Sequence, residues 1–225
     1  MTALLECVEV GPSNGSDATA SVVWMHGLGA SGHDFEPVVP LLQCPHVRFV
    51  FPHAPMYPVT INGGFVMPAW YDILTLEHVA DRENEAHIRT SAQQIEGLME
   101  RERERGIDPS RMVVAGFSQG AAMALHVGAR HEHALAGIMS LSGYHVLRPK
   151  FEAERNDANR DTEVFFGHGT HDPMVSVAWG KEAKADFERW TTAKTHWHEY
   201  PIEHHVCPEE IEAVGAWLRD RLPAR

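Results

Sequence analysis

Short apolar runs alternate along the chain with longer segments in which apolar residues recur every three or four positions. The short runs are rich in β-branched and aromatic residues and are bounded by glycine, proline or polar clusters, as is typical of buried strands; they cover residues 21–25, 48–51, 112–115, 137–143, 164–166 and 195–200. Strands that alternate with helices in this way predict a mostly parallel central sheet with helices on both faces. The predicted fold class is α/β.

The clearest predicted helix covers residues 85–105, and Gly106 follows it in the position that a glycine C-cap prefers. Its apolar residues share one face; they are Ile88, Ala92, Ile95 and Met99. The alternating glutamates and arginines at 100–105 are interpreted as a solvated helix end. Further helices are predicted at 33–42, 121–129, 179–190 and 207–222.

The pentad Gly116-Phe117-Ser118-Gln119-Gly120 separates a predicted strand from a helix rich in alanine, methionine and leucine. The Gly-x-Ser-x-Gly pattern is weak by itself, but a strand, this pentad and a helix in succession are the setting of a nucleophile elbow. Such a turn holds the serine on a strained backbone, and residues without a Cβ let strand and helix approach closely. Ser118 is therefore the predicted nucleophile, and the N–H of Gln119 is expected to face an oxyanion. The alternative is an ordinary glycine-rich connection.

Three further loops that follow predicted strands carry candidate chemistry. In the small-residue loop at 26–31, the N–H of Leu28 is the predicted second oxyanion donor. Asp172 lies in a glycine-rich loop just past a strand end, where a carboxylate can orient a base. His204 and His205 follow the last predicted strand. The residues alone leave open which of these two histidines is the base.

Loops at the carboxyl ends of parallel strands open at the same edge of the sheet, so Ser118, Asp172 and one histidine are expected to converge. In that arrangement the histidine takes the serine proton as the oxygen attacks an acyl carbon, and Asp172 orients the imidazole. The order Ser, Asp, His along the chain is that of α/β-hydrolases. These residues predict hydrolysis of an acyl substrate through an acyl-enzyme.

Residues 52–71 form a long segment with four prolines. Asn62-Gly63 between apolar runs at 59–61 and 65–67 predicts a small hairpin, and a loop this long in a compact domain is often functional. We interpret the segment as a flap beside the catalytic residues. The expected acyl-binding residues are Phe65, Met67, Trp70 and Val175. The alternative is that such side chains simply cover the edge of the core.

Three competing functions use other residues. Cys207 beside His205 could belong to a cysteine hydrolase, but Cys207 lies at a predicted helix start without an elbow. The alternating histidines of 131–133 and 196–198 could bind a metal, but no third ligand is evident, so no metal is predicted. A non-catalytic ligand-binding protein on the same fold is the third alternative, and a complete set of Ser118, Asp172 and histidine argues against it.

A length of 225 residues fits one α/β domain covering residues 1–225. The formal charge of −12 argues against nucleic acid or an anionic membrane surface as the main partner, although the 16 histidines could offset part of it below neutral pH. No apolar run approaches the length of a membrane span, and residues 1–10 lack the pattern of a secretory signal. Three cysteines without metal-like spacing are expected to be reduced, which predicts a cytoplasmic protein.

Much of the chain, from Val22 to about Leu218, resembles the phospholipase/carboxylesterase family of α/β-hydrolases, which includes the acyl-protein thioesterases. The matching segments are HGLG at 26–29, TINGG at 60–64, PAWYD at 68–72, AGFSQG at 115–120, GHG at 167–169 with Asp172, and YPIEHHV at 200–206. The resemblance implies the α/β-hydrolase fold and places the catalytic base on His204, with His205 in the next position.

The same resemblance implies hydrolysis of carboxylic esters or thioesters without a metal or organic cofactor. Oxygen esters, long-chain acyl thioesters on proteins and lysophospholipids all stay open as substrates, and so does a homodimer. One departure is Glu203, where the family usually has glycine. A carboxylate beside the base could raise the imidazole pKa, so Glu203→Gly is predicted to move the acid limb of the pH–rate profile to lower pH.

Overall fold

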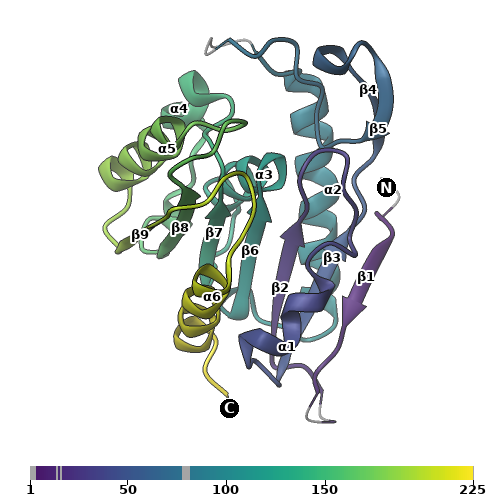
Figure 1. The fold of residues 1–225 in the computed structure, drawn as a ribbon. Coiled ribbons are helices and arrows are strands. Elements are labelled where there is room, and N and C mark those ends of the chain that lie inside the picture. Colours follow the sequence, from purple (N-terminus) through teal and green to yellow (C-terminus); the bar gives the residue numbers. More distant parts are fainter. Residues whose placement is uncertain (1–3, 14, 16, 78–81, 225) are drawn as a thin grey trace.

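A computed structural model describes residues 4–13, 15, 17–77 and 82–224 and contains a central seven-stranded sheet (Figure 1). Its strands, in spatial order, are β1 (Cys7–Val10), β3 (Val47–Pro52), β2 (Ala20–Met25), β6 (Met112–Phe117), β7 (Gly137–Leu141), β8 (Val164–Gly169) and β9 (Thr195–Tyr200). Only β1 runs antiparallel to its neighbour, β3; the other neighbours are parallel. The mostly parallel α/β sheet predicted from the sequence is confirmed.

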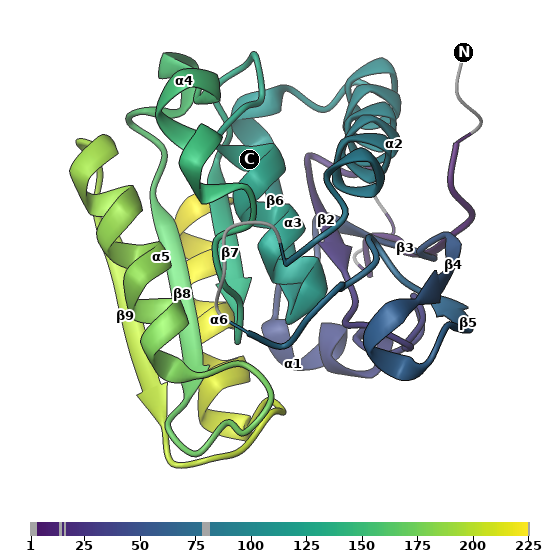
Figure 2. The same cartoon turned by 90° about the horizontal axis from the view of Figure 1, so that it is seen from above.

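Helices cover both faces of this sheet (Figure 2). They are α1 (Val39–Leu42), α2 (Glu85–Glu104), α3 (Gln119–Gly128), α4 (Phe151–Glu154), α5 (Val177–Trp190) and α6 (Pro208–Arg221). The apolar residues of α2, α3 and α5 form one core with one face of the sheet, and those of α1 and α6 form a second core with the opposite face. None of the described helices is long and apolar enough to cross a membrane.

Alternation along the central strands explains the two cores. In β2 the side chains of Val23 and Met25 pack into the core under α2 and α3, whereas Val22 and Trp24 pack into the core under α1 and α6. Successive side chains of a strand point to opposite faces, so a strand covered on both faces must be apolar throughout. The continuous apolar runs of the sequence therefore correspond to the middle of the sheet.

Helix α2 begins and ends where its capping residues predict. The Asn84 side chain accepts the backbone N–H of His87 at 3.1 Å, and Gly106 adopts a φ of +90°, which favours glycine. The charged end of this helix is not simply solvated, and the interpretation from the sequence was incomplete there. Glu102 is fully buried and accepts a hydrogen bond from Arg48 of β3 at 2.9 Å. The helix end is thus tied to the sheet.

The predicted hairpin exists, but its first strand begins earlier than expected. It pairs β4 (Met56–Val59) with β5 (Phe65–Pro68), and the intervening residues include a short 3-10 turn at Thr60–Asn62. Residues 60 and 61 do not pair in the β4–β5 ladder, because their N–H groups donate to the segment that follows β5. Thr60 N–H donates to Asp72 Oδ1 at 2.7 Å, and Ile61 N–H donates to the carbonyl of Ile73 at 3.2 Å.

Candidate active site

Ser118 stands at a sharp turn between β6 and α3, with φ 56° and ψ −118°. A non-glycine residue at positive φ is strained, and such strain persists only where the surroundings enforce it. Here the two glycines of the pentad let the strand and the helix pack closely enough to hold Ser118 in this strained conformation. A Cβ on Gly116 would lie 2.2 Å from the carbonyl of Gly120, and one on Gly120 would lie 2.3 Å from the carbonyl oxygen of Met25. β6 and α3 therefore approach each other more closely than a residue with a Cβ at either position would permit.

His204 lies in the connection between β9 and α6, and its ring bridges the other two predicted residues. Its Nε2 is 2.8 Å from Ser118 Oγ and its Nδ1 is 2.6 Å from Asp172 Oδ2. His205, the alternative that the residues alone left open, is exposed and donates its backbone N–H to the carbonyl of Glu203. The structure thus brings Ser118, His204 and Asp172 together, in that order.

Backbone bonds join the loop that carries Asp172 to the loop that carries His204. Thr170 N–H donates to the carbonyl of Tyr200 at 2.8 Å, and His171 N–H donates to that of Ile202 at 3.0 Å. A Cβ on Gly169 would lie 2.4 Å from the carbonyl oxygen of Glu203, so a larger residue there would separate the loops. This contact explains the glycine at the last position of β8, so the glycines predicted to lie in the loop belong to the end of the strand.

The Asp172 side chain is fully buried and accepts the backbone N–H groups of Met174 and Val175 at 2.8 Å each on Oδ1. Burial alone would raise the pKa of this carboxyl, but hydrogen bonds from His204 and from the two backbone N–H groups outweigh it and hold the pKa below its ordinary value. The carboxylate is therefore ionised at neutral pH. Its second oxygen is free to fix the tautomer of His204.

Two backbone N–H groups lie where the oxyanion donors were predicted, at the start of α3 and in the loop after β2. Gln119 is the first residue of α3, where the N–H has no partner within the helix. The loop after β2 packs against the elbow, since a Cβ on Gly27 would lie 3.4 Å from Ser118 Cβ. Leu28, Gln119, Ser118 and His204 all line the same cavity. The two residues that were predicted to supply the oxyanion donors therefore lie beside Ser118, and their role as donors stays a prediction.

This cavity has a volume of about 440 Å³ and an apolar wall. Met67 and Val175 line it, as expected for an acyl-binding pocket. Two other expected residues are not among its described lining residues, and those assignments are corrected. Phe65 stands at the outer end of β5 beside the 60–64 loop and is 68% exposed. Trp70 is fully buried in the core under α2 and α3, where its indole N–H donates to the carbonyl of His26 at 2.8 Å.

Several lining residues were not identified from the sequence. They come from the 60–62 turn, the segment after β5 and the loops after β7 and β8: Ile61, Asn62, Ile73, Leu76, Arg82, Tyr144 and Met174. The Gln119 side chain was also missed. It accepts the N–H of Trp70 and donates to the carbonyl of Tyr71, each at 2.7 Å, and so holds the chain after β5 against the elbow.

The residues of the competing functions lie elsewhere. Cys207 is the N-cap residue of α6, and burial raises the pKa of its thiol, which disfavours a nucleophilic thiolate. The rings of His131 and His133 contact each other. Both residues line a second cavity beside the start of β6, at the opposite end of that strand from Ser118. His196 pairs with Glu163. Among the described residues, no group of three or more His, Cys, Asp or Glu side chains is arranged to hold a metal ion.

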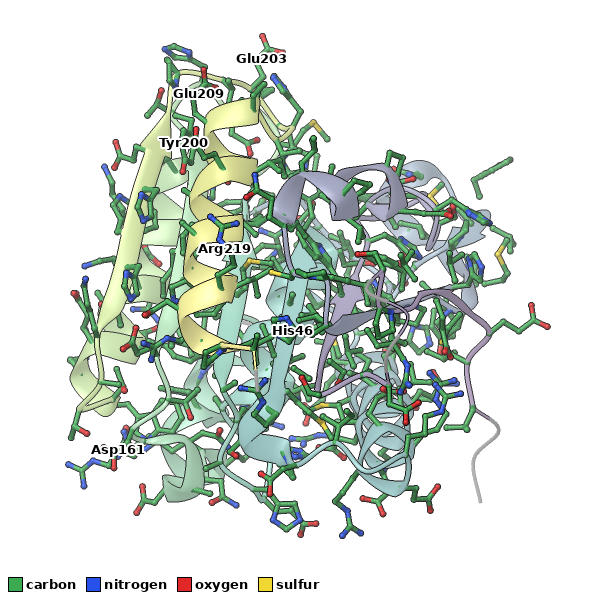
Figure 3. All side chains as sticks on the ribbon, turned by 90° about the horizontal axis from the view of Figure 1, so that it is seen from below. His46, Asp161, Tyr200, Glu203, Glu209 and Arg219 are labelled. Carbon is green, nitrogen blue, oxygen red and sulfur yellow. The ribbon has the colours of Figure 1, made fainter. Side chains whose placement is uncertain are left out.

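Glu203 is exposed, and Figure 3 shows its carboxylate at the outer tip of the connection between β9 and α6, pointing away from the body of the molecule. Its backbone carbonyl contacts the Asp172 loop, as described above, and also accepts the N–H of His205 at 3.0 Å. The extra side chain therefore does not occupy the cavity.

Comparison with known proteins agrees with this geometry. Residues 6–221 match the phospholipase/carboxylesterase family. The chain is 36% identical to acyl-protein thioesterase 1 of Mycosarcoma maydis over 239 residues, which cover 99% of each protein, and 36% identical to acyl-protein thioesterase 1 of Yarrowia lipolytica over 91% of this chain and 92% of that protein.

Solved structures show the same likeness. The crystal structure of Arabidopsis thaliana SOBER1 has a TM-score of 0.83 and 25% identity, with 90% of this chain and 99% of that chain covered. The crystal structure of esterase PE8 has a TM-score of 0.81 and 27% identity, with 98% of this chain and all of that chain covered. With its elbow, its sheet order and these relatives, the chain belongs to the phospholipase/carboxylesterase family of α/β-hydrolases.

Proposed function

We propose that Ser118, His204 and Asp172 are the catalytic triad of this serine esterase and that it cleaves carboxylic ester or thioester bonds of acyl substrates. The observation that carries the proposal is the continuous pair of hydrogen bonds from Ser118 Oγ through the two ring nitrogens of His204 to the buried carboxylate of Asp172. A neutral imidazole held in this way can accept a proton on Nε2.

The reaction begins when Ser118 Oγ attacks the acyl carbon and its proton passes to His204 Nε2. Asp172 stabilises the imidazolium that forms, and the N–H groups of Leu28 and Gln119 stabilise the tetrahedral oxyanion; one such donor is typically worth about 3 kcal/mol. His204 then gives the proton to the leaving alcohol or thiol. A water molecule attacks the acyl-enzyme through the same steps and restores Ser118.

The apolar wall beside Ser118 fits the acyl portion of the substrate. Met67, Val175 and the other apolar side chains of the cavity would shield a hydrocarbon chain from water, at about 0.8 kcal/mol per buried CH₂. The likeness to acyl-protein thioesterase 1 favours a thioester on an acylated protein as a second candidate substrate. The same triad can release either an alcohol, which needs the proton from His204, or a thiol, which depends on it less, so the leaving group is decided by experiment.

The test is a series of matched oxygen esters and thioesters with acyl chains of increasing length, with Ser118→Ala as the blank. We expect turnover in the wild type and a loss of at least about 10⁴-fold in the blank. A maximum at short chains assigns a general carboxylesterase, and a maximum at palmitoyl-like thioesters assigns depalmitoylation. Absence of turnover together with absence of Ser118 labelling by a fluorophosphonate would contradict the proposal and favour a binding protein.

A further inference from the structure

Arg82 places a buried positive charge in the mostly apolar wall of the active-site cavity. Among the described residues that line the cavity, Arg82 and Asp34 are those with a permanent charge. Asp34 is exposed, whereas Arg82 is 5% exposed. A buried guanidinium is expensive unless its donors are satisfied, so its presence beside Ser118 needs a reason beyond packing.

The guanidinium is held in one position by its neighbours. Its central carbon lies 4.7 Å from the centroid of the Tyr144 ring and 4.5 Å from that of Trp179. The backbone is fixed as well, because the N–H of Leu74 donates to the carbonyl of Arg82 at 2.7 Å and Glu83 forms a β-bridge with Ile73. Stacking between two rings leaves the edges of the planar guanidinium as the available hydrogen-bonding surface.

The hydrogen-bond donors along the edges of the Arg82 guanidinium are only partly satisfied. Arg82 Nε lies 2.8 Å from Glu83 Oε1, but this ion pair lacks hydrogen-bond geometry. Neither Nε nor Nη1 has a hydrogen-bond partner among the described residues, although both atoms are buried. A buried charge with incomplete compensation is destabilising, and an anion in the cavity that Arg82 lines would offset part of that cost. A carboxylate or phosphate matches the donor fork of arginine in shape and charge.

Glu83 compensates the charge of Arg82 only in part near neutral pH. Burial raises the pKa of the Glu83 carboxyl to about 7, in spite of Arg82 and a hydrogen bond with Tyr144, whose hydroxyl is also bonded to that of Tyr71. Among the residues that the structure describes, these are the charged and titratable groups that act on Glu83. When Glu83 takes up a proton, Arg82 loses the carboxylate that pairs with it among the described residues.

We propose that Arg82 is an anion-recognising residue of the active site and that the preferred substrates carry a carboxylate or phosphate at some distance from the bond that is cleaved. The proposal rests on the hydrolase function proposed above and narrows its substrate class. The anion can belong to the acyl portion, as in the half-esters of dicarboxylic acids, or to the alcohol portion, as in an acyl ester of glycerol phosphate. Both would place negative charge against the same guanidinium.

The first experiment compares substrates that differ only in this charge. Half-esters of C4 to C8 dicarboxylic acids are paired with esters of the monocarboxylic acids of equal length, and hexanoyl glycerol phosphate is paired with hexanoyl glycerol. The expected result is a kcat/KM ratio above one for the charged member at one chain length or in the phosphate pair, falling about 10- to 100-fold in Arg82→Gln. The uncharged member reports the proposed esterase function separately, with Ser118→Ala as its blank.

Arg103→Gln is the matched control, since Arg103 pairs with Glu100 on an exposed face of α2 and lines the second cavity instead. It should leave the charged-to-uncharged ratio unchanged. A ratio at or below one in every wild-type pair, with the uncharged esters turned over normally, would overturn the proposal while leaving the esterase intact. So would an equal loss for both members in a folded Arg82→Gln variant, because that result assigns Arg82 a structural role.

A second measurement needs no variant and so does not depend on folding. The ratio for the preferred pair is measured in the wild type between pH 6 and pH 8, where the titration of the triad affects both members and cancels. Where the preferred pair carries the phosphate, the ratio is first corrected for the second ionisation of the phosphate itself, which has a pKa of about 6. Protonation of Glu83 frees Arg82, so the ratio should be higher at pH 6 than at pH 8. In Glu83→Gln the ratio should stay high and flat. A ratio that is flat in the wild type would contradict the assignment of Arg82 as the anion-binding group.

Discussion

The molecule contains two histidine–aspartate pairs with similar geometry and different surroundings. His204 Nδ1 lies 2.6 Å from Asp172 Oδ2, and His145 Nδ1 lies 3.0 Å from Asp186 Oδ2. The side chain of His204 is 19% exposed and opens onto the cavity, whereas that of His145 is 2% exposed. Geometry of the pair alone therefore does not distinguish a candidate catalytic centre from a structural contact.

The second ring nitrogen makes the difference. His204 Nε2 lies 2.8 Å from Ser118 Oγ, so a proton can move between a nucleophile and the ring. His145 Nε2 is buried without a hydrogen-bond partner among the described residues, and the ring packs against Phe151 at 4.5 Å between centroids. Burial lowers the pKa of His145 in spite of the neighbouring carboxylate. This ring is a packed, neutral side chain.

The two carboxylates also differ in what compensates them. Besides its histidine, the hydrogen-bond donors to Asp172 among the described residues are neutral backbone N–H groups. Asp186 is shared with two arginines: Arg148 donates through Nε and Nη2 at 2.6 and 3.0 Å, and Arg189 donates to Oδ1. Neutral donors leave the charge of Asp172 to stabilise an imidazolium, whereas the arginines already neutralise Asp186. One pair is arranged for proton transfer and the other for stability.

Asp172→Asn tests the first half of this contrast and has the largest expected effect. An amide in that place favours the wrong tautomer of His204, so kcat/KM should fall by about 10⁴-fold at temperatures where the variant is folded. Hydrolysis of a short-chain ester is measured, with Ser118→Ala as the background. Asp186→Asn is the matched control and should keep kcat/KM within about threefold at temperatures where it is folded. Equal losses in the two variants would remove the distinction.

Asp186→Asn tests the second half through stability. Burial would raise the pKa of the Asp186 carboxyl, but hydrogen bonds from His145 and Arg148 dominate and lower it from 3.8 to about 2. A depressed pKa in the folded state stabilises the protein above the unfolded value, by about 2 kcal/mol for this shift, and the stabilisation is lost as pH falls from about 4 to about 2.

The free energy of unfolding in urea, measured from pH 7 to pH 2, checks this expectation. The wild type should be more stable than Asp186→Asn by about 2 kcal/mol at pH 7, and the two curves should converge as Asp186 is protonated in both folded and unfolded states. Curves that stay parallel would show that the variant acts by misplacing Arg148 or His145 and not through the charge of Asp186.

What could be predicted from the sequence was set by local sterics and periodicity. The elbow was recognisable because the contacts of Gly116 and Gly120 leave no room for a Cβ, so both positions of the pentad must be glycine. Helix α2 was recognisable from its apolar face and from Gly106. The meeting of Ser118, Asp172 and a histidine followed from the rule that parallel strands present their carboxyl ends at one edge. The choice of His204 over His205 required the family resemblance.

The wall of the cavity was less predictable because it depends on tertiary contacts between irregular segments. Phe65 and Trp70 are the large apolar side chains that a pocket typically uses, yet Phe65 is exposed beside a loop and Trp70 is buried in the core. Arg82 and Tyr144 carry no local signal at all; packing between loops far apart in the chain brings them to the cavity. Strand β1 was missed because four residues at a sheet edge have weak alternation.

Glu203→Gly has the smallest expected effect. It sharpens the contrast between the His204–Asp172 pair, which opens onto the cavity, and the buried His145–Asp186 pair. The Glu203 carboxylate is exposed, so water and salt screen its field at His204, and its removal should move the acid limb of the pH–rate profile to lower pH by at most a few tenths of a unit. Glu203→Gln is the matched control, since it removes the charge without adding glycine flexibility. The shift should be the same in both variants and vanish in 1 M salt. A larger shift confined to Glu203→Gly would trace the effect to the backbone that joins the His204 and Asp172 loops.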